Sequence, residues 1–238
     1  MTTKRQIVAM GGGGFSMEPE NLLLDQYVLN ATNLERPKVC FVPTASGDSA
    51  SYIERFYDAF KKLECEPSHL SLFNPHTWTQ DLEPFIARQN VLYFGGGNTR
   101  NALALWREWK LDRLLRAAYE LGAVMAGLSA GAICWFEQGS TDSIGRELGV
   151  LECLGWLKGS MTPHYDGEAQ RRPWLHKTIL KQRIQNGFAA DDGAALHFVN
   201  ENLERVVSSR FEARAYRVEL RVGEVLETPI STRFLGNL

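Results

Sequence analysis

The sequence has few cysteines, and none of them are paired at the spacing of a metal or redox motif. The four are Cys40, Cys65, Cys134 and Cys153, with no C-x-x-C run among them. Most of them stand in apolar stretches, which is typical of reduced buried thiols and not of disulfide partners or zinc ligands. We therefore expect free thiols, no metal site and a reducing compartment such as the cytosol.

An excess of charge of either sign is also lacking. The chain carries 26 basic and 28 acidic side chains, a net charge of −2, which gives no electrostatic basis for binding nucleic acid or an anionic membrane. It has no apolar run of the roughly 20 residues that a membrane-spanning helix needs, and no signal-peptide pattern. These absences predict a cytoplasmic protein with a small-molecule partner.

No Pro/Ser-rich linker divides the 238 residues, so we expect a single domain over residues 1–238. Strand-like and helix-like segments alternate along the first half, which predicts an α/β fold with a doubly wound, mainly parallel sheet flanked by helices. Near the C-terminus, short antiparallel strands are expected. The predicted strands lie at 6–10, 38–43, 69–73, 91–94, 121–126, 194–199, 206–209, 213–220 and 224–226, and the predicted helices at 21–32, 49–63, 81–88, 99–109, 130–136 and 173–185.

Four consecutive glycines, Gly11 to Gly14, follow the first predicted strand. A dinucleotide-binding fingerprint needs G-x-G-x-x-G opening directly into a helix. This run fits that frame only in part, and Glu18 and Glu20 near the next helix would repel a phosphate. We interpret the glycines as a close backbone approach beneath a functional site, and we expect no cofactor.

A short apolar run ends in Gly127-Leu128-Ser129-Ala130-Gly131. The G-x-S-x-G pattern between a strand and a helix is that of a nucleophile elbow, in which the serine takes a strained backbone conformation and projects its hydroxyl above the sheet. The amides at the start of the following helix would face an anion formed there. The alternative is an ordinary Gly/Ala-rich strand-to-helix turn.

A second glycine turn, residues 95–99, follows the strand predicted at 91–94. Loops at the carboxyl ends of strands build the sites of open α/β sheets, so this turn and Ser129 can lie side by side. Its amides could supply half of an oxyanion hole, with the amide of Ala130 as the other half. An anion-binding turn without a catalytic role remains the alternative.

A serine nucleophile needs a base, and Asp142 and His164 follow Ser129 in the order Ser, Asp, His found in hydrolases with such elbows. Pro163 precedes His164 and favours extended backbone before it, as expected at a strand end.

The adjacent carboxylates Asp191 and Asp192 point to different sides in an extended chain, so we assign them to a turn and not to a metal or acid–base site.

Taken together, these motifs resemble the peptidase E family of aspartyl dipeptidases and their relatives, including cyanophycinase. The motifs are the glycine turn at 95–99, the elbow at 127–132, Ser140-Thr141-Asp142 and Pro163-His164-Tyr165. The resemblance covers most of the chain. It implies a fold like that of class I glutamine amidotransferases, with serine in place of the elbow cysteine.

The resemblance also implies roles for individual residues: Ser129 as nucleophile, His164 as general base and Asp142 as the acid that orients the imidazole. Glu147 is the alternative acid, because relatives such as cyanophycinase use a glutamate further along the same loop. An oxyanion hole is implied from Gly96 or Gly97 together with Ala130, and we add Asn98 as a substrate-binding candidate.

The chain departs from aspartyl dipeptidases after the histidine. Where they carry a longer loop whose arginine binds the acidic side chain of the substrate, this chain has only Glu168 followed by Arg171 and Arg172. A guanidinium can bind a carboxylate bidentately, but the two arginines could equally be a solvated helix start. We predict a serine dipeptidase, monomeric or homodimeric, that acts on short peptides and prefers N-terminal Asp; the alternatives are an esterase-like hydrolase or a small-molecule binding protein.

Overall fold

A computed structural model of the chain describes residues 3–74, 81–145 and 147–237. Within these residues the strands are β1 (Gln6–Met10), β2 (Lys38–Val42), β3 (Glu66–His69), β4 (Val91–Phe94), β5 (Val124–Leu128), β6 (Phe136–Thr141), β7 (Gly149–Glu152), β8 (Leu157–Thr162), β9 (Gly187–Ala190), β10 (Ala194–Val199), β11 (Asn202–Ser208), β12 (Ala215–Arg221), β13 (Glu224–Ile230) and β14 (Thr232–Phe234). The helices are α1 (Gly14–Met17), α2 (Leu23–Asn30), α3 (Ala50–Phe60), α4 (Leu82–Ala87), α5 (Thr99–Glu108), α6 (Leu111–Glu120), α7 (Ala130–Ile133) and α8 (Arg171–Leu180), with a 3₁₀ turn at Thr44–Ser46.

The larger sheet has the strand order β14-β11-β10-β1-β5-β4-β2-β3. The strands from β1 to β3 pair in parallel, and β10 pairs antiparallel with β1 and with β11. The carboxyl ends of β1, β5 and β4 therefore meet at one edge. The glycines after β1, the elbow after β5 and the glycine turn after β4 are brought together there, as predicted.

Helices cover both faces of the larger sheet because its central strands alternate apolar residues to both sides. In β1, Ile7 and Ala9 belong to the core shared with α4, α5 and α6, whereas Val8 and Met10 belong to the core shared with α1, α2 and α3. A strand buried on both faces reads as a continuous apolar run, which is why β1, β2, β4 and β5 were visible in the sequence.

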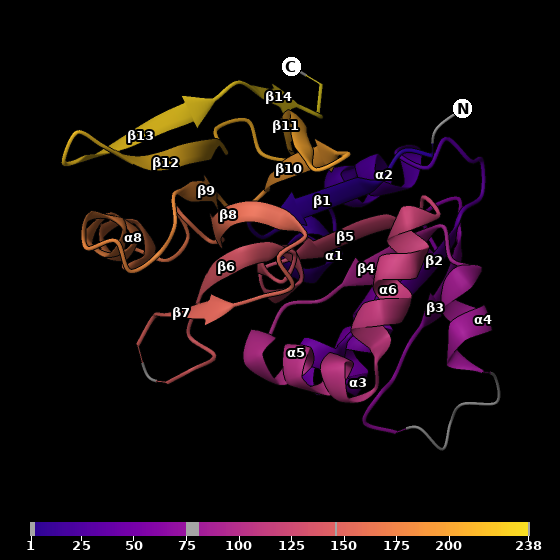
Figure 1. Cartoon of the computed structure of the whole chain (residues 1–238). Coiled ribbons are helices and arrows are strands. Elements are labelled where there is room, and N and C mark those ends of the chain that lie inside the picture. The colour runs from indigo at the N-terminus through magenta and orange to yellow at the C-terminus, as the bar shows by residue number, and fades with distance from the viewer. Residues whose placement is uncertain (1–2, 75–80, 146, 238) are drawn as a thin grey trace.

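The smaller sheet has the order β13-β12-β9-β8-β6-β7. Its middle strands β6, β8 and β9 are parallel, while β7 at one edge, and β12 and β13 at the other side, are antiparallel to their neighbours. Figure 1 shows this sheet at the opposite end of the molecule from α4 and β3, with α8 beside it and the β12–β13 hairpin forming one of its sides. The short antiparallel strands expected near the C-terminus are therefore confirmed.

Several elements differ from the sequence analysis, which predicted no strand at β7, β8 or β14. The third strand is Glu66–His69, several residues before the predicted 69–73, and α6 was assigned to no element. The elbow helix ends at Ile133, although it was predicted to reach residue 136, because the carbonyl of Trp135 accepts hydrogen bonds from Trp156 and Leu157. These hydrogen bonds between distant parts of the chain end the helix, and β6 begins at Phe136, where the sequence predicted the last residue of the helix.

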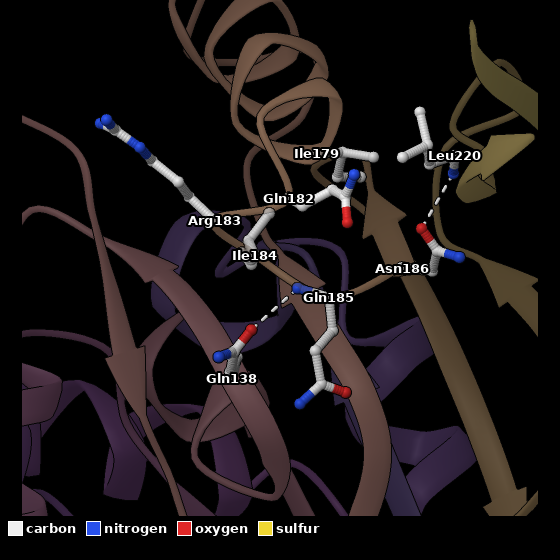
Figure 2. A pocket seen from close by; sticks show the side chains of 8 residues that line it. All are labelled: Gln138, Ile179, Gln182, Arg183, Ile184, Gln185, Asn186 and Leu220. Carbon is white, nitrogen blue, oxygen red and sulfur yellow. Dashed lines mark hydrogen bonds between the residues drawn. The ribbon is translucent and has the colours of Figure 1, made fainter. Parts of the chain in front are cut away.

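Amide side chains line a depression between α8 and the smaller sheet (Figure 2). The side-chain oxygen of Gln138 on β6 accepts a hydrogen bond from the amide of Gln185 at 2.8 Å, and that of Asn186 accepts one from the amide of Leu220 on β12 at 2.8 Å. These two contacts tie the segment after α8 to β6 on one side and to β12 on the other.

One acidic side chain is buried in the core of the larger sheet. Asp25 on α2 has no exposed surface and accepts a hydrogen bond from the hydroxyl of Tyr93 at 2.8 Å. Burial raises the pKa of this carboxyl to about 7, against the smaller opposing effect of the Tyr93 hydrogen bond. The ordinary value is 3.8, so the folded chain holds a proton on Asp25 across a range where the unfolded chain does not.

We expect this proton to make stability fall as pH rises from 5 to 8. The pKa of Asp25 is higher in the folded chain than in the unfolded chain. The stabilisation that this proton contributes is therefore greatest at low pH and is lost as the pH rises through about 7. The free energy of unfolding falls by up to about 1.4 kcal/mol per pH unit in this range. Urea unfolding at several pH values should give a negative slope for the wild type and a flatter one for Asp25→Asn. Equal slopes in the two proteins would contradict the assignment.

Candidate active site

Ser129 stands at the turn between β5 and α7. Its backbone has φ 54° and ψ −113°, a conformation that residues other than glycine rarely adopt and that costs on the order of 1–3 kcal/mol. The predicted outlier conformation at the elbow is confirmed. The serine side chain also lines a cleft at the carboxyl end of the larger sheet.

The glycines on either side of Ser129 are explained by packing. A Cβ atom added to Gly127 would lie 2.5 Å from the carbonyl oxygen of Gly131, and one added to Gly131 would lie 2.3 Å from that of Phe94. Both distances are far below a van der Waals contact. The elbow can therefore lie against β4 only with glycine at both positions.

The end of β1 anchors the backbone of both Ser129 and His164. The amide of Ser129 donates to the carbonyl of Met10 at 3.2 Å, and the amide of His164 donates to that of Gly11 at 3.1 Å. Consecutive Cα atoms are about 3.8 Å apart, so the two residues are anchored on neighbouring peptide groups. Among the described residues, no hydrogen bond joins the side chains of Ser129 and His164; in free enzymes such bonds are often long and tighten on substrate binding.

His164 is oriented by Asp192. The Nδ1 atom of His164 lies 2.6 Å from Oδ1 of Asp192, and the two side chains are only 14% and 9% exposed. An ionised carboxylate can only accept a hydrogen bond, so Nδ1 carries the proton and Nε2 is left as the basic nitrogen. The amide of Asp192 in turn donates to Oδ1 of Asp166 at 2.7 Å, which fixes this turn.

The contact expected between Asp142 and His164 is therefore wrong. His164, Asp142 and Asp192 follow β8, β6 and β9, and β8 lies between the other two strands. The two carboxylates thus follow the strands on either side of β8, but only Asp192 contacts Nδ1, and Asp142 lines the cleft with Ser129. Glu147, the alternative acid, is exposed on the loop between β6 and β7 and is not among the residues that line this cleft.

Sequence reasoning missed Asp192 because it treated Asp191-Asp192-Gly193 as a turn and nothing more. The turn follows β9, and β9 pairs in parallel with β8, whose end carries His164. A signal was present in the sequence, since a short apolar strand at 188–190 leads directly into the carboxylates. What the sequence did not contain was the information that β8 and β9 are neighbours.

Two backbone amides, one of the cleft residue Gly97 and one of Ala130 directly after Ser129, are free to donate. In the part of the chain that the structure describes, the amides of Gly97 and Ala130 donate no hydrogen bond, whereas that of Gly96 donates to the hydroxyl of Tyr52 at 3.2 Å. Gly97 has φ +132°, and a Cβ there would lie 2.3 Å from the carbonyl oxygen of Ala45. Glycine is thus required at a position that lines the cleft together with Ser129.

The two candidate arginines lie in different places. Arg171 is 3% exposed and lines the cleft, where its guanidinium donates to both carboxylate oxygens of Glu168 at 2.8 and 3.3 Å and to the carbonyl of Ser140 at 3.1 Å. The guanidinium of Arg172 instead packs over the rings of Tyr165 and Tyr216, at 4.6 and 5.0 Å from the ring centroids.

The cleft has a volume of about 370 Å³, within the range of small-molecule sites. It is lined by Gly97, Asn98, Ser129, Asp142, Ser143, Glu168 and Arg171. Asn98 also caps α5, since its side-chain oxygen accepts a hydrogen bond from the amide of Asn101 at 2.9 Å. Among residues 3–74, 81–145 and 147–237, no group of three or more His, Cys, Asp or Glu side chains is placed to hold a metal ion.

The model of peptidase family S51 matches residues 7–206, a span that contains the elbow, His164 and Asp192. The chain belongs to peptidase family S51. The peptidase YgaJ of Bacillus subtilis (strain 168) is 58% identical over 232 residues, which cover 98% of this chain and 100% of that one. The resemblance to peptidase E seen in the sequence is confirmed, and the family is one of hydrolases that cleave peptides.

Two solved structures with peptidase titles share the fold. A peptidase from an acI-B1 actinobacterium matches with a TM-score of 0.68 and 17% identity over 95% of this chain and 98% of that one. A protein described as peptidase E from Listeria monocytogenes EGD-e matches with a TM-score of 0.59 and 17% identity over 88% of this chain and 100% of that one. The predicted fold of the class I glutamine amidotransferase type is confirmed.

The chain also lacks a membrane-spanning helix within the described ranges, since none of the helices found there is long and apolar enough to cross a bilayer.

The four cysteines are free; Cys40, Cys65 and Cys134 are buried and Cys153 is partly buried. Burial raises the pKa of the Cys65 thiol to about 11 and that of Cys153 to about 12. These thiols are therefore protonated at neutral pH, and none of them stands at the elbow.

Proposed function

We propose that this S51 peptidase is a serine peptidase that cleaves short peptides through an acyl-enzyme on Ser129. One observation supports the proposal above all: a serine in a strained elbow, and a histidine whose Nδ1 is bound to a buried carboxylate, are anchored on neighbouring peptide groups at the end of β1. That arrangement leaves the basic Nε2 available to the serine hydroxyl. A merely structural turn has no need for either the strain or the buried pair.

The chemistry follows from these positions. Nε2 of His164 takes the proton of Ser129 Oγ as the alkoxide attacks the carbonyl carbon of the peptide, and Asp192 stabilises the imidazolium. The amides of Gly97 and Ala130 donate to the oxyanion. His164 then gives its proton to the departing amine, and water, activated by the same nitrogen, hydrolyses the acyl-enzyme.

The charged groups of the cleft suit a short peptide with a free N-terminus. The carboxylate of Asp142 has no hydrogen-bond or ion-pair partner among the described residues and lines the same cleft as Ser129, so it can bind an α-ammonium group. Arg171 lines the cleft too and can bind a side-chain carboxylate bidentately, though Glu168 already competes for it. We propose a preference for N-terminal Asp on these grounds.

Fluorophosphonate labelling tests the proposal directly. The wild type should be labelled at Ser129, and it should hydrolyse Asp-Leu faster than Asn-Leu, Ala-Leu and Leu-Leu. Labelling without cleavage of any dipeptide would favour an esterase-like hydrolase on the same triad. No labelling would reject the serine mechanism and favour a binding protein.

Arg171→Gln should raise KM for Asp-Leu by about 10- to 100-fold, because a hydrogen bond to a charged group contributes about 1.5–3 kcal/mol. Turnover of Asn-Leu should stay nearly unchanged, since the effect is one of binding and not of chemistry. Each substrate is assayed on the same preparation, so a general loss of folded protein would lower both rates. An equal rise in KM for the two dipeptides would argue against a subsite at Arg171 for an acidic side chain of the substrate.

A further inference from the structure

The residues that flank the catalytic pair are each held by the same C-terminal hairpin. Tyr165, directly after His164, donates its hydroxyl to Oε2 of Glu227 on β13 at 2.5 Å. Asp191, directly before Asp192, accepts hydrogen bonds from the amide of Arg214 at 2.9 Å and from the hydroxyl of Tyr216 on β12 at 3.3 Å. The loops carrying the histidine and its carboxylate are thus tied to one element.

Glu227 is the centre of these contacts. Its carboxylate is 17% exposed and accepts from Tyr165, lies 2.7 Å from Nε2 of His176 on α8 and 3.6 Å from the guanidinium of Arg172. A carboxylate with this many donors is fixed in position. Burial and the contact with Glu227 both raise the pKa of Tyr165, so its hydroxyl remains a donor at neutral pH.

The aromatic rings complete the link. The rings of Tyr165 and Tyr216 lie 5.4 Å apart, and the guanidinium of Arg172 packs over both. Tyr165 is 2% exposed and shares a small core with Leu175 and Val218, from α8 and β12. A shift of the hairpin would therefore be transmitted to the backbone of residue 165.

His164 depends on such support because its own backbone is strained. It has φ 51°, a region that residues other than glycine occupy at a cost that the surroundings must offset. Its amide is held by Gly11 and the next amide by the carbonyl of Ala190 at 3.1 Å. The side chain of Tyr165 is the third anchor of this turn, and the one that reaches outside the parallel strands.

We propose that the β12–β13 hairpin positions the His164–Asp192 pair, with Glu227 as a positioning residue that acts through Tyr165. The proposal rests on the serine mechanism proposed above. Glu227 does not touch the reacting atoms. It fixes the turn from which His164 reaches Ser129, so its loss should weaken catalysis more than substrate binding.

The test measures the second-order rate of Ser129 labelling by a fluorophosphonate, together with kcat and KM on the best dipeptide. Glu227→Ala and Tyr165→Phe should each lower the labelling rate and kcat by about 10- to 100-fold with KM within threefold. The double variant should lose no more than either single one, because both changes break the same link. Glu227→Gln, which keeps an acceptor for the tyrosine hydroxyl, should recover most of the activity.

Glu224→Gln is the matched control, since it removes the same charge from the same strand; its rates should equal those of the wild type. Tyr165→Phe keeps the buried ring, so it reports on the link even if Glu227→Ala does not fold. If the wild type is labelled and the variants react at unchanged rates, Glu227 has no positioning role, and the serine mechanism stands. Additive losses in the double variant would lead to the same conclusion. Failure of the wild type to be labelled would reject the mechanism and the positioning role with it.

Discussion

Replacing Asp192 by asparagine is expected to lower kcat by about 10⁴-fold, the cost of stabilising the wrong histidine tautomer. The carboxylate accepts a hydrogen bond from Nδ1–H of His164 at 2.6 Å. An amide in the same place can donate to Nδ1, which moves the ring proton to Nε2 and removes the base. The two side chains have nearly the same shape, so the thermal stability of the variant should change little.

Asp142→Asn and Glu147→Gln are the matched comparisons for Asp192→Asn. Asp142 lines the cleft without meeting His164, so its amide should raise KM for peptides with a free N-terminus and leave kcat within about tenfold. Glu147→Gln should behave as the wild type, since this side chain is exposed outside the cleft. A loss of about 10⁴-fold in kcat for Asp142→Asn, with little change for Asp192→Asn, would return the orienting role to Asp142.

Replacing Ser129 by alanine is expected to lower kcat by about 10⁶-fold, as the loss of the serine alone does in a serine protease whose other groups remain. The residual rate would come from the amides and from substrate positioning. The backbone strain of the elbow is kept in this variant, because alanine has the same difficulty as serine at φ 54°. Single-turnover and steady-state rates on a labelled dipeptide measure the loss of turnover. The variant should form no detectable fluorophosphonate adduct.

Ser129→Gly separates strain from chemistry. Glycine adopts positive φ without steric cost, so this variant should be more stable than Ser129→Ala by about 1–3 kcal/mol in urea unfolding, while being equally inactive. The gain is reduced by the greater freedom of glycine in the unfolded chain. If Ser129→Gly were no more stable than Ser129→Ala, the elbow would carry no strain.

Local sequence patterns were enough to predict the elbow and the central strands of the larger sheet. The elbow could be recognised because a strained serine between two close backbone approaches allows only small residues around it, and Gly127 and Gly131 pack against β4 as that requires. Strands β1, β2, β4 and β5 were visible because each is buried on both faces. By contrast β6 is interrupted by polar residues, and its pairing with β8, not its composition, makes it a strand.

The orienting acid could not be found in this way. Asp142 fitted the chain order of known elbows, but order along the chain does not say which strands are neighbours. Because β8 lies between β6 and β9, the strands before Asp142 and Asp192 both neighbour the strand before His164, and only the three-dimensional arrangement shows that Asp192 contacts Nδ1. The same holds for Arg171 and Arg172, which are adjacent in sequence but face the cleft and the C-terminal hairpin respectively.

The sequence by itself determined the family, the candidate nucleophile, the candidate base and the glycines around them, because each of these depends on residues close together in the chain. The tertiary structure decided the candidate for the orienting acid, the backbone amides left free to donate and the contacts of the C-terminal hairpin with the loops of His164 and Asp192. These depend on which strand ends meet, and strand order is set by the burial of both sheets as a whole and by no single segment.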